Sequence, residues 1–425
     1  MRNLVLKIMQ TGGAKIYSVL LGIITLSITA RWLGPEGRGI VASITTWVNL
    51  FAEVTAISLG SVLIFKASKG RDDKWLPTVL GTLFGHTLIV SIFSWLLVAL
   101  LYIGGQHWGW VKALDNLPAI PLMVGFLVLP LILWEVYTNA LLNIEDRLSA
   151  FNRFQVMGST SNSVFIVLLV VIADFGVLGV LISKIIWQSI IAFGGIRELL
   201  KRSTTRLSYS YTLYKDLLKN GIKMHLGTIG AIMTTSIDVV MVNAYLGNEA
   251  TGIYQLAVQM CQMLLIVSYA ANTVLQGELT RKGVHGVWPF QKKILFLTLA
   301  FIISVSIFSG STAKWWLIWL AGEEFRQAIP VFQLLLMTIV VNTFTTVMSV
   351  QWIGRGWFLL NSTITLIKGT MNIGLNAVLI PEFGIFGAVY ATIGVVSFSL
   401  LVNILMFIYF ELDARRHNKL SPGSS

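Results

Sequence analysis

Charged residues are scarce in this sequence. They make up 12% of 425 residues, against about 25% in a typical soluble chain. Hydrophobic residues make up 55%, and the mean hydropathy is +0.77. Because a chain this apolar would aggregate in water, the composition excludes a soluble globular protein and predicts one surrounded by lipid. Apolar stretches of about 20 residues, enough to cross a hydrocarbon core of about 30 Å, recur along the whole chain.

Cysteine is nearly absent, and motifs of catalysis are missing. The single cysteine, Cys261, excludes an intrachain disulfide. The chain has no G-x-x-x-x-G-K-[ST] phosphate-binding loop, no G-x-S-x-G nucleophile elbow, and no cluster of His, Cys and carboxylates with metal-ligand spacing. We therefore expect no enzymatic activity, no metal site and no bound organic cofactor.

The net charge of +12 raises the question of nucleic-acid binding. Nucleic-acid-binding domains gather their cations on one basic patch. Here the cations are spread over short loops between apolar stretches, which is the pattern that membrane topology produces. We therefore expect membrane lipids, and not nucleic acid, as partners.

The apolar stretches predict an all-α integral membrane protein of about twelve transmembrane helices. They are too long and too uniformly apolar for barrel strands, which alternate over about ten residues. The first lacks a small-residue cleavage site, so we expect a retained helix and not a signal peptide. The predicted spans, each within a few residues, are 12–33, 38–65, 76–103, 118–142, 156–173, 176–197, 221–245, 250–277, 291–311, 327–350, 358–380 and 385–410.

The distribution of cations predicts the orientation. With the N-terminus in the cytoplasm, five of the 31 Lys and Arg fall outside, three fall within spans and 23 face the cytoplasm. This asymmetry predicts cytoplasmic N- and C-termini. The basic segment 198–220 has two open interpretations: a plain linker, or an amphipathic helix on the anionic inner leaflet.

Two motifs recur at half the chain length. WLGPEGRGIV begins at Trp32 and YLGNEATGIY at Tyr245, an offset of 213 residues. DFGVLGV begins at Asp174 and EFGIFGA at Glu382, an offset of 208. Individually these glycines are typical of tight turns, but together they predict a duplication into parallel six-helix halves. The predicted divisions are an N-terminal lobe at 1–197, a basic linker at 198–220, a C-terminal lobe at 221–412 and a cytoplasmic tail at 413–425.

These motifs resemble those of the Wzx-type polysaccharide and O-antigen flippases of the multidrug/oligosaccharidyl-lipid/polysaccharide (MOP) exporter superfamily. The pattern after the first helix is matched by Arg31, Leu33, Gly34, Pro35, Glu36 and Gly39. The pattern of the seventh helix is matched by Asp238, Leu246, Gly247, Gly252, Tyr254 and Ala257. The pattern near the end is matched by Asn372, Asn376, Leu379, Ile380, Pro381, Gly384, Gly387, Ala388, Ala391 and Thr392.

The resemblance implies a V-shaped transporter of two lobes that works by alternating access in the bacterial inner membrane. The implied substrate is an oligosaccharide on undecaprenyl pyrophosphate, destined for O-antigen, capsule or exopolysaccharide. A glycan polymerase and ligase are possible partners. The chain has no room for the two extra helices of the superfamily's fourteen-helix lipid II flippases, so that branch is not expected.

Ionisable residues within the spans are the candidate functional residues, because each costs about 2.5–3.5 kcal/mol at the membrane centre on insertion scales. The candidate cavity cations that would contact an anionic substrate are Lys368, Lys184, Arg31 and Lys15. The candidates for coupling to H⁺ or Na⁺, or for gating, are Asp238, Glu53, Glu135 and His86. The alternatives are ion pairs and other structural roles, with an interfacial position for Lys15 and Arg31.

Three other functions stay open. A multidrug efflux antiporter of the same superfamily would be expected to have an acidic, aromatic pocket, and the deep lysines disfavour it. A membrane glycan polymerase or ligase would be expected to have a large outer loop, which this sequence lacks. A scaffold for glycosyltransferases, without transport, is the third.

Overall fold

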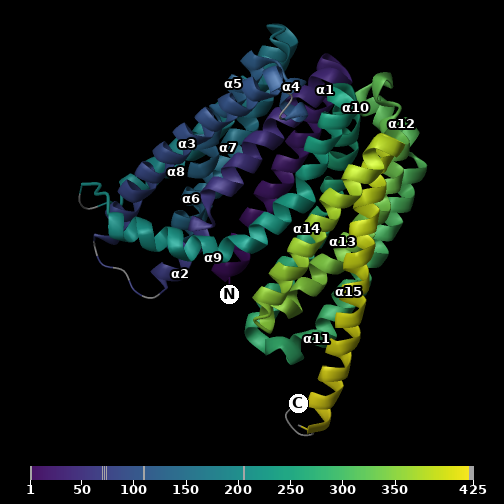
Figure 1. The fold of residues 1–425 in the computed structure, drawn as a ribbon. Helices are drawn as coiled ribbons and strands as arrows, with labels where there is room; N and C mark the ends of the chain where they lie inside the picture. The colour runs from purple at the N-terminus through teal and green to yellow at the C-terminus, as the bar shows by residue number, and fades with distance from the viewer. Residues whose placement is uncertain are drawn as a thin grey trace. The chain divides into compact units, whose positions relative to one another are not determined.

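The computed structural model describes the backbone of residues 2–420 apart from 69, 71, 73, 109, 110, 204 and 205. Side chains are described from Tyr17 to His417 within those limits. Lys15, one of the predicted cavity cations, lies outside the residues whose side chains are described. All regular elements in the described part of the chain are helices (Figure 1).

The helices of the first half are connected by short segments. Their bounds are α1 Arg2–Ala56, α2 Leu59–Ala67, α3 Trp75–Trp108, α4 Lys112–Asp115, α5 Ala119–Phe126, α6 Leu129–Ile144, α7 Leu148–Ile166 with a π-helical continuation at Val167–Ile172, α8 Gly176–Leu200 and α9 Tyr211–Thr235. The helices of the second half are α10 Ile237–Leu264, α11 Ile266–Ser311, α12 Ala313–Ala321, a 3₁₀ turn at Glu323–Phe325, α13 Ala328–Gly354, α14 Phe358–Phe383 and α15 Ile385–Leu420.

Nine helical segments of the described chain are long and apolar enough to cross a membrane. Two of them, Tyr17–Ala67 with 51 residues and Tyr211–Ser311 with 101, are too long for one crossing, since about 20 residues suffice. Large apolar side chains such as Leu88, Phe93 and Leu96 on α3 are exposed, as on a lipid-facing surface. The protein is therefore a multi-pass helical membrane protein, and the count of twelve crossings stays a prediction.

The repeated L-G motif bends the helices in which it lies. Gly34 in α1 has φ 63° and ψ −176°, and Gly247 in α10 has φ 82° and ψ −172°. A side chain disfavours this left-handed conformation, whereas glycine adopts it freely. Pro35 follows at once, where its missing N–H costs no helical hydrogen bond. The motif therefore ends one helix and begins another without an intervening loop.

The duplication extends to further pairs of residues with positive φ. Each pair is separated by nearly the same number of residues as Gly34 and Gly247. The pairs are Gly70 and Gly283, Asp146 and Gly356, and Gly176 and Gly384. Because the backbone changes direction at matching places in the two halves, the conformation supports the duplication that the sequence motifs indicated.

Several predicted spans are interrupted within the membrane region. Ile57 and Ser58 separate α1 from α2, and Leu127 and Val128 separate α5 from α6. Backbone groups freed at such a break must find partners, because lipid offers none. The Trp95 indole donates to the Phe126 carbonyl oxygen at 3.0 Å and so satisfies one of them.

Contacts divide the chain into two compact units. Unit 1 comprises Met1–Ile232 and Val239–Gly252, and unit 2 comprises Met233–Asp238 and Ile253–Ser425. The lobe boundaries stated above, at 197, 220 and 412, stay a prediction. In unit 1, α7 packs on α8 and α1, and in unit 2, α11 packs on α13 while α14 packs on α15.

Helix α9 packs across an end of the unit 1 bundle (Figure 1). Asp216 of α9 forms an ion pair with Lys66 of α2, and the Ser58 hydroxyl lies 3.1 Å from Nδ1 of His225. Gly221 allows close packing, because an added Cβ would lie 2.3 Å from the Ile57 carbonyl oxygen. Most of α9 is thus part of unit 1, and its first ten residues belong to the basic segment 198–220, for which a linker and an amphipathic helix were the two interpretations.

Candidate functional site

Asp238 lies in the first turn of α10 and is the most buried Asp or Glu residue in the described part of unit 2. Its side chain is 6% exposed. Oδ1 accepts hydrogen bonds from the Nδ2 groups of Asn372, at 2.6 Å, and Asn376, at 2.7 Å. Oδ2 accepts from the hydroxyls of Tyr254 and Thr392, each at 3.2 Å. We call these five residues the Asp238 cluster.

The cluster brings together residues of α10, α14 and α15. Asn372 and Asn376 are one turn apart on α14 and so share a face of that helix. Asn372 also donates to the Met233 carbonyl oxygen at 3.2 Å, close to the break between α9 and α10 at Ser236. The carboxylate is therefore held where two helices meet end to end.

The chemistry of the cluster suits a proton or a small cation. All four donors to Asp238 are neutral, so the hydrogen bonds leave the charge of an ionised carboxylate uncompensated. Asn376 is 0% exposed, and its Oδ1 has no hydrogen-bond partner among the residues that the structure describes. Carboxylate, amide and hydroxyl oxygens are ligands of hard cations. Within the described residues no group of three or more His, Cys, Asp or Glu could hold a metal ion, so a site here would rest on one carboxylate and neutral oxygens.

Lys368 lies one turn before Asn372 on the same face of α14. Four residues correspond to about 6 Å along a helix. The side chain is half-buried. This position, one turn from the Asp238 cluster, is consistent with the role predicted for Lys368, which is contact with an anionic substrate. That role stays a prediction.

Glu135 and Lys184 lie together in unit 1. Glu135 of α6 accepts hydrogen bonds from two glutamines, Gln155 of α7 at 2.6 Å and Gln188 of α8 at 2.7 Å. Lys184 lies one turn before Gln188 and interacts electrostatically with Glu135. The sequence placed Glu135 among possible partners of membrane lysines, and the glutamines that bind it were not identified.

The other predicted residues occupy separate places. His86 of α3 is 0% exposed; its Nε2 lies 3.1 Å from the Thr55 carbonyl oxygen and its Nδ1 lies 3.4 Å from the Tyr214 hydroxyl. This arrangement is typical of a structural histidine. Glu53 and Arg31 are both exposed on α1. Their predicted roles in coupling and substrate contact stay predictions.

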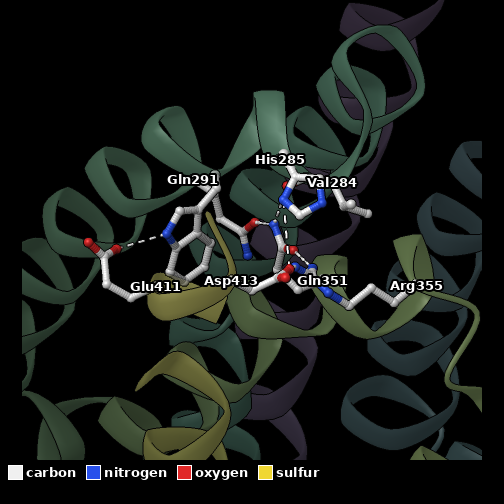
Figure 2. A network of polar contacts seen from close by, with 8 residues as sticks. Val284, His285, Gln291, Gln351, Arg355, Glu411 and Asp413 are labelled. Carbon is white, nitrogen blue, oxygen red and sulfur yellow. Dashed lines mark hydrogen bonds and ion pairs between the residues drawn. The ribbon is translucent and has the colours of Figure 1, made fainter. Parts of the chain in front are cut away.

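A second polar network fixes the end of α15 in unit 2 (Figure 2). Arg355, directly after α13, pairs with Asp413 of α15 at 2.7 Å, and Trp288 of α11 donates to Glu411 at 2.9 Å. Gln351 donates to Gln291 Oε1 at 2.7 Å. These bonds join α11, α13 and α15, and because the groups satisfy one another, the network is best explained as structural.

The residues that bind Asp238 were visible in the sequence as motif matches but not as a site. The four hydrogen-bond donors of Asp238 were named from the sequence only because they match family patterns: Asn372, Asn376, Tyr254 and Thr392. Uncharged polar residues in membrane spans carry a weaker signal than ionisable ones. The available signal was the pair of asparagines one turn apart in an apolar helix, where each amide needs a partner.

The fold is that of known membrane transporters. It matches the inward-facing conformation of a MATE-family multidrug resistance transporter of the MOP superfamily, with a TM-score of 0.73, 17% identity and coverage of 95% of this chain and 96% of that one. It also matches the inward closed conformation of the lipid II flippase MurJ, with a TM-score of 0.77, 14% identity and coverage of 98% and 93%. The predicted helical transporter fold is confirmed.

The sequence comparison gives the family. The family described as "Polysaccharide biosynthesis protein" matches residues 4–275, and the chain belongs to it. The resemblance to Wzx-type flippases is thereby confirmed at the level of the family. An uncharacterized membrane protein of Methanocaldococcus jannaschii is 22% identical over 198 residues, which cover 45% of this chain and 39% of that protein.

Proposed function

We propose that this protein is a flippase that moves undecaprenyl-pyrophosphate-linked oligosaccharide from the cytoplasmic to the outer leaflet by alternating access. Membership of the polysaccharide biosynthesis family is the observation that carries the proposal. The fold supports it, because a lipid II flippase, MurJ, and a MATE-family transporter have the same fold. The protein would reside in the bacterial inner membrane with both termini in the cytoplasm, the orientation that the distribution of its cations favours.

The Asp238 cluster would couple transport to H⁺ or Na⁺. A buried carboxylate with only neutral donors gains stability when it binds a proton or a cation. Hydrogen bonds to residues of α10, α14 and α15 mean that this binding would change how the ends of three helices are held. An inside-negative potential also favours outward movement of an anionic headgroup, by about 2.3 kcal/mol per charge per 100 mV.

Multidrug efflux is the second candidate, because the fold matches MATE-family transporters as well as MurJ. An efflux pump for organic cations would use acidic and aromatic side chains in its pocket. The half-buried Lys368 disfavours such a pocket and favours an anionic substrate. A glycan polymerase or ligase is disfavoured, because the fold matches transporters. Either enzyme would be a natural partner of the flippase.

The decisive experiment uses a strain that lacks this gene. We expect undecaprenyl-linked oligosaccharide to accumulate on the cytoplasmic face and surface polymer to be lost, with both effects reversed by the gene. Complementation with Asp238→Asn tests the coupling site, and Asp174→Asn, an exposed aspartate outside the helices, is the matched control. Unchanged glycan in the deletion strain would refute the proposal and lead to efflux assays. Accumulation on the outer face would mean that translocation is intact and would favour a polymerase or ligase.

A further inference from the structure

Three helices of unit 1 bring a second set of polar side chains together. Glu135 Oε1 accepts from Gln155, and Oε2 accepts from Gln188. Because a carboxylate only accepts, these contacts fix which end of each glutamine amide faces it. Lys184, one turn from Gln188 on α8, adds an ammonium group. We call Glu135, Gln155, Gln188 and Lys184 the Glu135 cluster.

Close helix packing holds the cluster in place. A Cβ added to Gly195 of α8 would lie 2.6 Å from Cβ of Thr138 on α6. A Cβ added to Gly158 of α7 would lie 2.4 Å from Cδ1 of Trp187 on α8. Helix α8, which carries Lys184 and Gln188, therefore packs closely against both α6 and α7.

The cluster has hydrogen-bonding capacity that the protein leaves unused. An ionised carboxylate offers about four acceptor sites, and the two glutamines occupy two of those on Glu135. Gln188 is 5% exposed, and its Oε1 has no hydrogen-bond partner in the described part of the chain. A buried acceptor without a partner is costly, so its persistence points to a group that arrives from outside the protein.

The charges of the cluster select the kind of group. Glu135 repels a phosphate, and Lys184 repels a metal cation or an organic cation. A neutral hydroxyl is compatible with both Glu135 and Lys184, because it donates to a carboxylate or amide oxygen and accepts from an ammonium or amide N–H. A sugar presents several such hydroxyls.

The depth of the cluster agrees with passage of a headgroup. Gln188 lies twelve residues from each end of α8, Gly176–Leu200, which is about 18 Å at 1.5 Å per residue. It therefore lies near the middle of a hydrocarbon core of about 30 Å. Glu135, Gln155 and Lys184 are partly exposed there, and a charged group at this depth faces a wet path and not lipid.

We infer that the Glu135 cluster is a sugar-binding subsite that contacts hydroxyl groups of the glycan, separately from any contact with its pyrophosphate. The inference rests on the proposed flippase function and names the part of the substrate that this site recognises. In this subsite, Gln155, Gln188 and Glu135 contact the glycan. Lys184 contacts a neutral hydroxyl group and not a phosphate.

The test compares two lipids that differ only in the glycan. One is the undecaprenyl-pyrophosphate-linked glycan isolated from cells lacking this gene, and the other is undecaprenyl pyrophosphate. The dissociation constant of each is measured with the purified full-length protein in lipid nanodiscs. We expect the wild type to prefer the glycan-bearing lipid by about tenfold or more, since a few hydrogen bonds distinguish the two.

The variants assign the preference to the cluster. Gln155→Leu, Gln188→Leu and Lys184→Met should each reduce the preference while leaving the affinity for undecaprenyl pyrophosphate unchanged. Lys184→Met retains both hydrogen bonds to Glu135, so it remains informative if a glutamine variant does not fold. Gln333→Leu on α13, which removes a single bond to the Gly310 carbonyl oxygen, is the matched control.

Each other outcome overturns the inference in its own way. Equal loss of affinity for both lipids in the variants would mean that the cluster contacts pyrophosphate or only holds the helices. Equal affinity of the wild type for both lipids would refute the sugar subsite and leave the flippase proposal intact. A wild type that binds neither lipid would refute the proposed function itself, and the subsite with it.

Discussion

The two copies of the L-G motif contact each other through glycines within unit 1. A Cβ added to Gly39 would lie 1.7 Å from the Asn248 carbonyl oxygen. A Cβ added to Gly252 would lie 1.9 Å from the Pro35 carbonyl oxygen. Each glycine comes five residues after the bend of its own motif, at Gly34 or Gly247, so the contact is reciprocal. We predict that alanine at either glycine destabilises the protein.

The magnitude follows from the distances. Cβ atoms in proteins essentially never approach another heavy atom closer than 3.0 Å. The Gly39→Ala variant therefore requires the segments to separate by roughly 1.3 Å at this point, against a backbone atom that cannot turn aside. Overpacking of this kind costs about 1–3 kcal/mol. The methyl group would thus hold the two motifs apart, and their close contact would be lost.

Thermal unfolding of the purified protein in detergent measures the effect. Gly39→Ala and Gly252→Ala should each lower the Tm, and the double variant should lose less than the sum, because one separation relieves both clashes. Gly374→Ala is the control, since a Cβ there meets nothing within 4 Å. In this helical position alanine is favoured over glycine by about 1 kcal/mol, so its Tm should stay or rise.

Two results would contradict this reasoning. If Gly39→Ala unfolds at the same temperature as Gly374→Ala, the motifs do not pack as closely as the structure has them. If the two single variants add fully in the double variant, the glycines act independently and the reciprocal contact is wrong.

Three further predictions concern the membrane-embedded polar residues. Asp238→Asn should reduce glycan export at least tenfold at normal protein level, because the coupling carboxylate is gone; normal export would remove Asp238 from coupling. Lys368→Ala should abolish export at normal level while Lys368→Arg retains part of it, as measured by surface glycan, and full export by the alanine variant would exclude substrate contact. His86→Phe should lower the Tm, because leaving its hydrogen-bond partners unpaired costs about 1–3 kcal/mol of unfolding free energy. It should not alter the ratio of export at pH 6 to that at pH 8, and a changed ratio would make His86 functional.

The bends of the chain were predictable from the sequence. Gly34 and Gly247 occupy equivalent places in two copies of one motif, and both have positive φ in the structure. A conformation that favours glycine is a local property, fixed by the residue and its neighbours. The same holds for the membrane character of the chain, because the transfer free energy of an apolar stretch depends on its own side chains.

The partners of the buried carboxylates were not predictable. Asp238 is bound by Asn372 and Thr392, which lie 134 and 154 residues further along the chain. Glu135 was a candidate for coupling or for an ion pair. It interacts electrostatically with Lys184, but its hydrogen-bond donors, Gln155 and Gln188, were not identified from the sequence. A rotation of α14 or α8 about its own axis would turn these donors away while leaving every hydropathy value unchanged.

The sequence by itself therefore determined the membrane environment, the duplication and the positions of the bends, because each can be recognised from short stretches of residues without knowing which helices pack together. Only the tertiary structure decided which polar side chains meet in the membrane. That choice depends on how far each helix is rotated and how closely its neighbours approach, as at Gly158 and Gly195. Since lipid offers no hydrogen bonds, those contacts decide which buried groups are satisfied and which, like the Gln188 amide oxygen, are left for a substrate.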